Sequence, residues 1–308
     1  MIKPIVLYNQ EIWAADLPVN FQKAIMSDKI ISNKQYTNFI NNSPAEQVHL
    51  KYNRMVLGVK KYTPNIAVRA ELGKYPLYID SFITLVKYWL RLCNLPKDRL
   101  VVDALECNYI IHQQGIFSWA SAVHYILEKT GFSHVWEKKG TENEARFLRE
   151  LSACLKNEYD NLFRESLFND NRQDPNAHNK LRTYRLYKTD HRQEDYLNHV
   201  NNPIICNSIS KMRLGDHKLM IEKGRHLRIP AKDRICNKCN TKEVGDEYHA
   251  IMVCTANALL RTELYDQLSL SVENWDNISL SDKFLTIMQA KTCPYAVGKF
   301  FMSILSSL

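Results

Sequence analysis

The chain has 308 residues, 45% of them hydrophobic and 24% charged, so it can bury a sizeable core and is not globally disordered. Its net charge of +8 is uneven: residues 1–100 hold 14 basic and 7 acidic side chains, residues 101–200 hold 13 and 15, and residues 201–308 hold 14 and 11. Two basic regions flank a nearly neutral middle, which favours an acidic partner such as nucleic acid. No stretch approaches the ~18 apolar residues of a membrane span. No export signal is visible, so we expect an intracellular protein of the nucleus or cytoplasm with no membrane partner.

The first half of the chain has the periodicity of helices. Apolar residues three and four apart lead up to Gly58, a natural C-cap, and Thr63-Pro64 offers an N-cap followed by proline at the first helical position. Pro76 opens a third helix, whose apolar stripe we expect in the core (Ile79, Phe82, Ile83, Val86, Trp89 and Leu90). Further helices are predicted at 101–111, 119–127 and 144–168. Two-residue alternation is rare, so the fold is predicted to be mainly α with few strands.

A polar stretch at 169–180 is predicted to be the main linker. After it, Ile204–Leu219 is predicted to form a pair of helices. Residues 257–271 and 280–307 are predicted to form two closing helices.

One tight group of metal-type ligands follows the pattern Cys236-x2-Cys239-x9-His249-x4-Cys254. Three cysteines and one histidine are a standard ligand set of structural Zn²⁺. The two-residue spacer lets Cys236 and Cys239 approach one ion from a tight turn, and the four-residue gap lets His249 and Cys254 converge from one short helical element. Gly245 and Asp246 before that element are a plausible turn and N-cap.

Other interpretations of these residues remain. Cys236 and Cys239 could form a redox pair, but they follow Ile229-Pro230 and a charged stretch, and that reading leaves His249 and Cys254 unexplained. The cysteines could also be ordinary buried residues, and His226 is an alternative ligand. A catalytic zinc is disfavoured, because four protein ligands leave no open position for water.

Basic residues surround the metal motif. Between Lys211 and Lys242 there are ten Lys or Arg and three acids (Asp216, Glu222 and Asp233), a net charge of +7. A second set lies between the apolar residues of the first half (Lys51, Arg54, Lys60, Lys61, Arg69 and Lys74). Both sets are candidates for phosphate contacts, and a solvated protein surface is the other explanation.

Three blocks of sequence occur in a recognisable order. The first is Ile2-Lys-Pro-Ile-Val-Leu-Tyr-Asn-Gln-Glu-Ile-Trp13, the second runs from His49-Leu-Lys-Tyr-Asn-Arg-Met-Val-Leu-Gly58 to Tyr88-Trp-Leu-Arg-Leu92, and the third from Lys211-Met-Arg-Leu-Gly215 to Cys254. Together they resemble the C-terminal part of reverse transcriptases of non-LTR (LINE-type, jockey-like) retrotransposons. They are similar, in turn, to the palm–thumb junction, the helical thumb and the zinc-knuckle region. Asn9 replaces a glycine that is frequent in the first block.

This resemblance implies a domain plan and a set of contacts. Residues 1–33 would end a palm-like segment and its connection, 34–168 form a helical thumb-like domain, 169–180 a linker, and 181–308 a basic helical region with the zinc knuckle at 231–256. Zn²⁺ would be structural. RNA, DNA or an RNA/DNA hybrid would be the partner, contacted by position through seven basic residues (Lys51, Arg54, Lys60, Lys61, Arg225, Lys232 and Arg234). Arg228 and Lys238, from the basic run around the metal motif, are two further candidates.

The chain departs from this family in its catalytic residues. The family's polymerases hold two magnesium ions with an Asp-Asp motif and a third aspartate, and two-metal phosphoryl transfer needs these carboxylates close together. No Asp-Asp dipeptide occurs here, and neither an endonuclease nor a ribonuclease H domain is evident. We therefore expect a truncated RNA-directed DNA polymerase with no catalytic residues of its own, whose polymerase core another chain could supply. The alternative is a zinc-stabilised helical protein-interaction module that does not bind nucleic acid.

Overall fold

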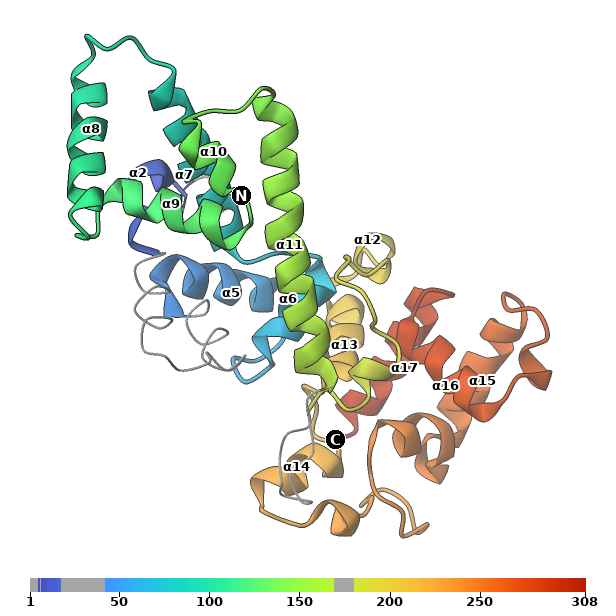
Figure 1. Ribbon diagram of the computed structural model, residues 1–308. Coiled ribbons are helices and arrows are strands. Elements are labelled where there is room, and N and C mark those ends of the chain that lie inside the picture. The colour runs from blue at the N-terminus through green and yellow to red at the C-terminus, as the bar shows by residue number, and fades with distance from the viewer. Residues whose placement is uncertain (1–4, 6, 18–41, 169–179) are drawn as a thin grey trace. The chain divides into compact units, whose positions relative to one another are not determined.

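The computed structural model describes residues 5, 7–17, 42–168 and 180–308 (Figure 1). These residues form mainly α-helices, and the one β pairing among them is an isolated antiparallel bridge between Ile235 and Val244. The predicted mainly α fold is thereby confirmed. The chain divides into two compact units: unit 1 is Met1–His49 with Tyr75–Leu162, and unit 2 is Leu50–Lys74 with Phe163–Leu308.

Unit 1 is built from helices that pack around α7 (Leu77–Cys93). The predicted stripe of α7 is buried at Ile79, Phe82 and Trp89, among others. The helices of this unit are α2 (Gln10–Trp13), the start of α5 (Pro44–Leu57), α8 (Leu100–Gln113), α9 (Trp119–Lys129), α10 (Ser133–Glu137) and most of α11 (Glu144–Phe168).

Aromatic rings fill the interior of unit 1. The Trp89 and Trp136 rings stack with their centroids 5.4 Å apart. The Trp89 indole N–H donates to the Tyr109 hydroxyl at 2.8 Å, so the buried polar atoms of both rings are satisfied. Residues far apart in the sequence therefore specify one packed arrangement of α7, α8 and α10.

Unit 2 is organised around the contact between α13 (Pro203–Arg213) and α17 (Pro294–Ser306). The two helices approach closely at Gly298, where a Cβ atom would lie 2.4 Å from Ile205 Cγ2. The other elements of this unit are α6 (Asn65–Leu72), η1 (Tyr184–Leu186), α12 (Tyr196–His199), α14 (Met220–His226), η2 (Ala231–Asp233), η3 (His249–Val253), η4 (Thr255–Asn257), α15 (Ala258–Ser269), η5 (Trp275–Asn277) and α16 (Leu280–Gln289).

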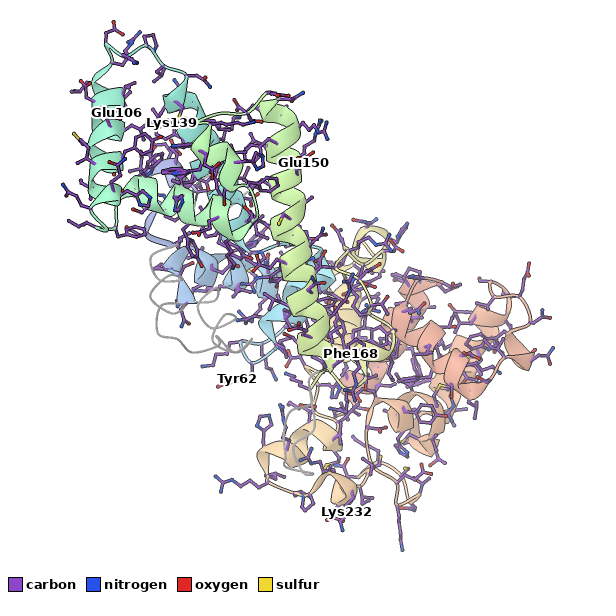
Figure 2. All side chains as sticks on the ribbon, viewed as in Figure 1. Tyr62, Glu106, Lys139, Glu150, Phe168 and Lys232 are labelled. Carbon is purple, nitrogen blue, oxygen red and sulfur yellow. The ribbon has the colours of Figure 1, made fainter. Side chains whose placement is uncertain are left out.

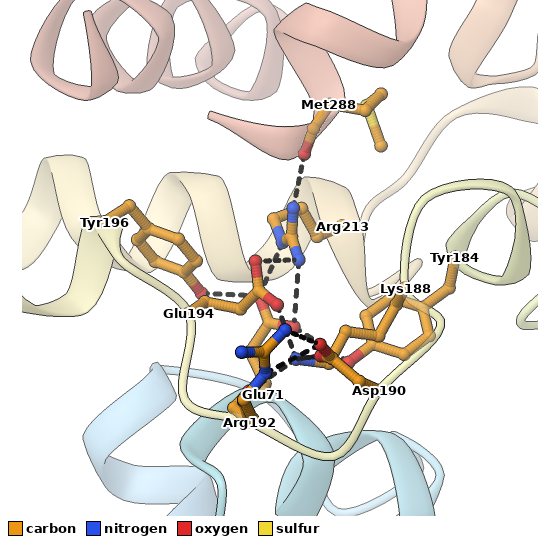
Figure 3. A network of polar contacts seen from close by, with 9 residues as sticks. All are labelled: Glu71, Tyr184, Lys188, Asp190, Arg192, Glu194, Tyr196, Arg213 and Met288. Atoms are coloured by element: carbon orange, nitrogen blue, oxygen red, sulfur yellow. Dashed lines mark hydrogen bonds and ion pairs between the residues drawn. The ribbon is translucent and has the colours of Figure 1, made fainter. Parts of the chain in front are cut away.

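A buried ion network joins α6 to α13 in unit 2 (Figure 3). The Arg213 guanidinium lies 2.5 Å from a Glu71 carboxylate oxygen and 2.7 Å from a Glu194 oxygen, and both the Arg213 and the Glu71 side chains are fully buried. The Tyr184 and Tyr196 hydroxyls donate to the two Glu71 oxygens at 2.9 and 2.8 Å. A buried charge is costly unless it is paired and hydrogen-bonded, and here both conditions hold.

Several predicted elements differ from the structure. The closing segment 280–307 is two helices, because the left-handed Ala290 ends α16 and Pro294 begins α17. Ile204–Leu219 holds one helix, α13, which Gly215 follows in a left-handed turn. Gly58 is left-handed as its C-cap role requires, but Pro64 occupies the N-cap position of α6 and no side chain accepts a capping hydrogen bond there. The predicted linker lies outside the described residues except for Lys180, and so do residues 18–33 of the palm-like segment.

The described part of the chain contains no helix that is both long and apolar enough to cross a membrane.

His191 gives unit 2 a defined acid sensitivity. Burial, with smaller contributions from the Lys188 and Arg69 charges, lowers the pKa of His191 from 6.5 to about 4. The unfolded chain protonates the His191 imidazole at a higher pH than the folded chain does. The contribution of neutral His191 to the free energy of unfolding is therefore complete above pH 6.5 and is lost as the pH falls toward 4. This loss amounts to at most about 3 kcal/mol.

The expected result is that His191→Gln flattens this part of the stability–pH profile. Chemical denaturation of the wild-type and His191→Gln proteins at several pH values measures the free energy of unfolding. Subtracting one profile from the other cancels the titration of all groups that the two proteins share. Parallel profiles between pH 6.5 and 4 would contradict the prediction.

Candidate metal centre

The first two candidate ligands lie in a loop closed like a hairpin. The Cys236 N–H donates to the Glu243 carbonyl at 2.8 Å, and the Gly245 N–H donates to the Arg234 carbonyl at 2.9 Å. These bonds flank the Ile235–Val244 bridge and bring the chain back on itself. Within the loop the Lys238 N–H points to the Cys236 sulfur at 3.4 Å.

The other two candidate ligands belong to one short helical turn. Asp246 caps it, since its carboxylate accepts the His249 N–H at 2.8 Å. The turn continues as the π-helix η3, in which the Cys254 N–H donates to the His249 carbonyl at 2.7 Å. This five-residue hydrogen bond, wider than that of an α-helix, places His249 and Cys254 one turn apart on the same side.

The four side chains converge. One ligand atom from each of Cys236, Cys239, His249 and Cys254 can be chosen so that all lie within 4.8 Å of one another. The Cys236 and Cys254 sulfur atoms are 3.9 Å apart, and the Cys239 sulfur is 3.2 Å from His249 Nε2. Metal–sulfur bonds of about 2.3 Å in a tetrahedral site place two sulfur atoms ~3.8 Å apart. The group predicted from the sequence could therefore hold a metal ion.

Neighbouring groups orient and tune the ligands. His249 presents Nε2 to the cysteines, while its Nδ1 lies 2.9 Å from a Glu243 carboxylate oxygen. Such a carboxylate fixes the orientation and tautomer of a metal-binding imidazole. The Thr241 hydroxyl and N–H lower the pKa of Cys239 to about 6, whereas burial raises the pKa of Cys254 to about 11. Metal binding must therefore release a proton from Cys254, because the thiolate is the ligand.

Ion pairs hold the helical turn of the metal group in place. The Arg182 guanidinium donates to both Glu247 carboxylate oxygens at 2.6 and 2.8 Å, and to Glu222 at 2.7 Å. His217 Nε2 lies 2.9 Å from Glu247. The Arg182 charge holds the pKa of the buried Glu247 carboxyl well below its usual range, against the effect of burial. Glu247 lies two residues before His249, so this pairing positions a candidate ligand.

Gly245 is required by the close approach of two chain segments at the metal group. A Cβ atom here would lie 3.0 Å from Cys236 Cα and 3.1 Å from Met220 Cβ. We expect Gly245→Ala to displace Cys236 and to cost about 1–3 kcal/mol of stability. Thermal melting and competition with a chelator for the bound metal measure the change. Gly140→Ala is the control, because the nearest atom to its Cβ would be 3.8 Å away; equal effects of the two changes would refute this role.

The predicted phosphate contacts differ in exposure. Six are exposed (Lys51, Lys60, Lys61, Arg228, Lys232 and Lys238), and Figure 2 shows Lys232 at the surface. Arg54 and Arg225 are half-buried and paired with Asn65 and Glu222, respectively. Arg234 is buried and donates to the Ile229 and Ile221 carbonyls at 2.9 Å, so it supports the fold and is not a phosphate contact. Arg69, which belongs to the second set of basic candidates, is buried as well.

The two basic segments, 51–61 and 211–242, meet within unit 2. The Lys60 N–H donates to a carboxylate oxygen of Asp216 at 2.8 Å. Lys180 lies in the same neighbourhood: burial lowers the pKa of its ammonium group, the Glu222 and Asp216 charges oppose this, and the Arg225 and Lys60 charges add to it. Lys180 belongs to the predicted linker, and no sequence pattern indicates that it lies near Lys60 and Asp216.

Other residues around the metal group were also missed from the sequence. Glu243, which contacts His249, and Arg182, which contacts Glu247, belong to no recognisable motif. The alternative ligand His226 is exposed at the end of α14 and is not part of the group.

No protein-family model, curated protein or solved structure matches this chain, so its own geometry has to carry the functional conclusion.

Proposed function

We propose that this chain binds nucleic acid through a basic surface on unit 2, and that a structural Zn²⁺ ion held by Cys236, Cys239, His249 and Cys254 stabilises that surface. The observation that carries the proposal is the meeting of two basic segments, distant in the sequence, at the Lys60–Asp216 contact. Phosphate binding needs several cations close together on a preformed surface, and this contact brings the two basic segments together.

Zinc is the ion that best suits the donor set. Three thiolate-forming cysteines and one imidazole are soft to borderline ligands, which zinc accepts in a tetrahedral arrangement and which magnesium and calcium do not favour. Because the protein supplies all four ligands, the ion would have no open position for substrate or water. Its role would be to close the 231–256 segment.

The origin proposed for the chain is the C-terminal part of a non-LTR retrotransposon reverse transcriptase, on the three sequence blocks described above. Such a protein would grip RNA, DNA or their hybrid by the backbone, without catalysis of its own. In support, the four side chains of the Cys3His group, which belong to the third block, converge in the structure.

The proposal predicts that the two basic segments act as one surface. We expect Lys60→Ala with Lys61→Ala, and Arg228→Ala with Lys232→Ala, each to reduce the salt slope of binding by about 1–2, since each lost phosphate contact removes ~0.7–0.9. Fluorescence polarisation with labelled RNA and duplex DNA over a salt series measures the slopes.

The matched control is Lys291→Ala with Lys299→Ala, which removes two exposed cations of unit 2 outside both segments. It should leave the slope nearly unchanged. If the control lowers the salt slope as much as the two test variants do, the effect depends on net charge alone and not on these two segments. If binding by the wild-type protein does not depend on salt, the proposal is refuted.

Exposed apolar side chains in unit 1 favour protein interaction as a second candidate function. Helix α8 has only Leu105 and Tyr109 buried, whereas Leu100 is 83% exposed and Ile110 54% exposed. Ile5, Tyr8 and Ile12 near α2 are exposed as well. Apolar surface of this kind suits a protein partner, such as a chain that supplies a polymerase core. Partner binding that tolerates high salt, without nucleic-acid binding, would favour this function.

A further inference from the structure

An exposed aromatic ring lies on the loop between α5 and α6, at the point where the first basic segment contacts the second. Tyr62, labelled in Figure 2, follows Lys60 and Lys61 between α5 and α6. Its side chain is 70% exposed. The Lys61 ammonium group is 5.0 Å from the centroid of the Tyr62 ring. Its neighbour in sequence, Thr63, is buried. The ring is thus presented to solvent and contributes little to the core.

The loop that carries Tyr62 is firmly held. The Thr63 N–H donates to the Lys60 carbonyl at 3.0 Å, which makes Lys61 and Tyr62 the central residues of a β-turn. The Lys60 N–H is bound to Asp216, and an Arg54 guanidinium nitrogen donates to the Thr63 carbonyl at 3.4 Å. A ring on a fixed turn loses little conformational freedom when a flat ligand stacks on it.

The charges around the ring select the ligand. Lys60 and Lys61 are exposed, and the Lys60 and Arg225 charges both act on the half-buried ammonium group of Lys180. Cations next to an exposed aromatic face are the combination with which proteins bind unpaired nucleotides: the cations contact phosphates and the ring stacks on a base. In a continuous duplex the base faces are covered by their neighbours, so a ring at the surface adds nothing.

We propose that Tyr62 is a base-stacking platform, so that the basic surface of unit 2 takes a nucleic acid with at least one unpaired nucleotide at the 60–62 turn. This inference rests on the proposed function. It specifies that the preferred nucleic acid is a single strand, or a junction with a single strand, and not a continuous duplex. Met55 and Val56, at the end of α5 shortly before the turn, are exposed as well.

The test compares Tyr62→Ala with wild-type protein, both carrying their bound metal, in polarisation binding to a labelled single-stranded RNA and to a blunt duplex of the same sequence. Loss of one stacked base should weaken single-strand binding roughly 5- to 100-fold. Duplex binding should change less than about twofold, because the lysines that contact phosphate remain. Tyr62→Phe should retain wild-type affinity. Tyr62→Trp should bind as well and show quenching of the added indole fluorescence by single-stranded RNA.

The chain offers a matched control for this experiment. On α17, Tyr295 is 48% exposed and the Lys299 ammonium group lies 5.0 Å from its ring centroid, so the same pair occurs outside both basic segments. Tyr295→Ala should leave single-strand binding unchanged. If Tyr62→Ala weakens neither ligand, or weakens both equally, the stacking platform is refuted while nucleic-acid binding stands. If wild-type protein binds neither ligand, the proposed function itself fails.

Discussion

Replacing Cys236 and Cys239 together with serine should release the zinc ion that we propose for this site and unfold residues 231–256 before the rest of unit 2. Serine hydroxyls are poor zinc ligands, and His249 and Cys254 alone do not complete a tetrahedral site. In small zinc domains the apparent binding free energy reaches about 10–16 kcal/mol and is largely folding free energy, so the change removes the main local stabilisation. Hydrogen exchange of the backbone amides, with zinc content measured on the same sample, would follow the loss.

The structure also predicts where unfolding should stop. Ala250 and Ile251 in η3 are part of the unit 2 core, together with residues of α13 and α17. Exchange should therefore rise first in the 236–243 loop and only later in η3. The control is Cys107→Ser with Cys293→Ser, two cysteines outside the group. An undiminished zinc content in the Cys236→Ser, Cys239→Ser protein would disprove the ligand assignment.

Arg213→Met should be among the most destabilising single changes in the chain, with an expected loss of about 3–5 kcal/mol. Methionine preserves part of the side-chain volume but leaves the fully buried Glu71 carboxylate without its cation. It also removes the donor to the Met288 carbonyl, 2.5 Å from an Arg213 nitrogen, at the end of α16. Chemical denaturation followed by far-UV circular dichroism measures the change.

Two further variants separate charge from packing at this network. Adding Glu71→Leu to Arg213→Met should recover part of the lost stability, because no unpaired charge remains. Arg146→Met is the comparison for an exposed ion pair: Arg146 pairs with Glu150 at 2.8 Å on the surface of α11, where screening makes such pairs weak. A double variant less stable than Arg213→Met alone would contradict the account of a buried charge.

Local patterns in the sequence predicted most elements, since they depend on near neighbours. The end of α5 at Gly58 and the buried stripe of α7 follow from capping and from 3.6-residue periodicity. The metal group was predictable for the same reason, because ligand spacing on a tight turn and on one helical turn restricts which side chains can converge. The π-helical form of that second turn has no signal in the residue types.

What the sequence could not reveal is which charges are buried. Arg213 and Arg234 count toward the +7 of the segment between Lys211 and Lys242, yet each is only 2% exposed. Arg213 meets Glu71 across 142 positions of sequence, and no local pattern encodes such a pairing. For the same reason the inclusion of Leu50–Lys74 in unit 2 could not be anticipated. Charge counts therefore identified a basic region but not which of its residues reach a ligand.

The most direct test of the central claim is the salt dependence of nucleic-acid binding by the wild-type protein, measured on a sample of known zinc content. Single-stranded RNA, duplex DNA and the RNA/DNA hybrid would be compared by polarisation over one salt series. With one equivalent of zinc and phosphate contacts from Lys60, Lys61, Arg228 and Lys232, the account predicts a log–log slope of about −3 for the single strand. A slope near zero for all three ligands, with zinc fully bound, would contradict it.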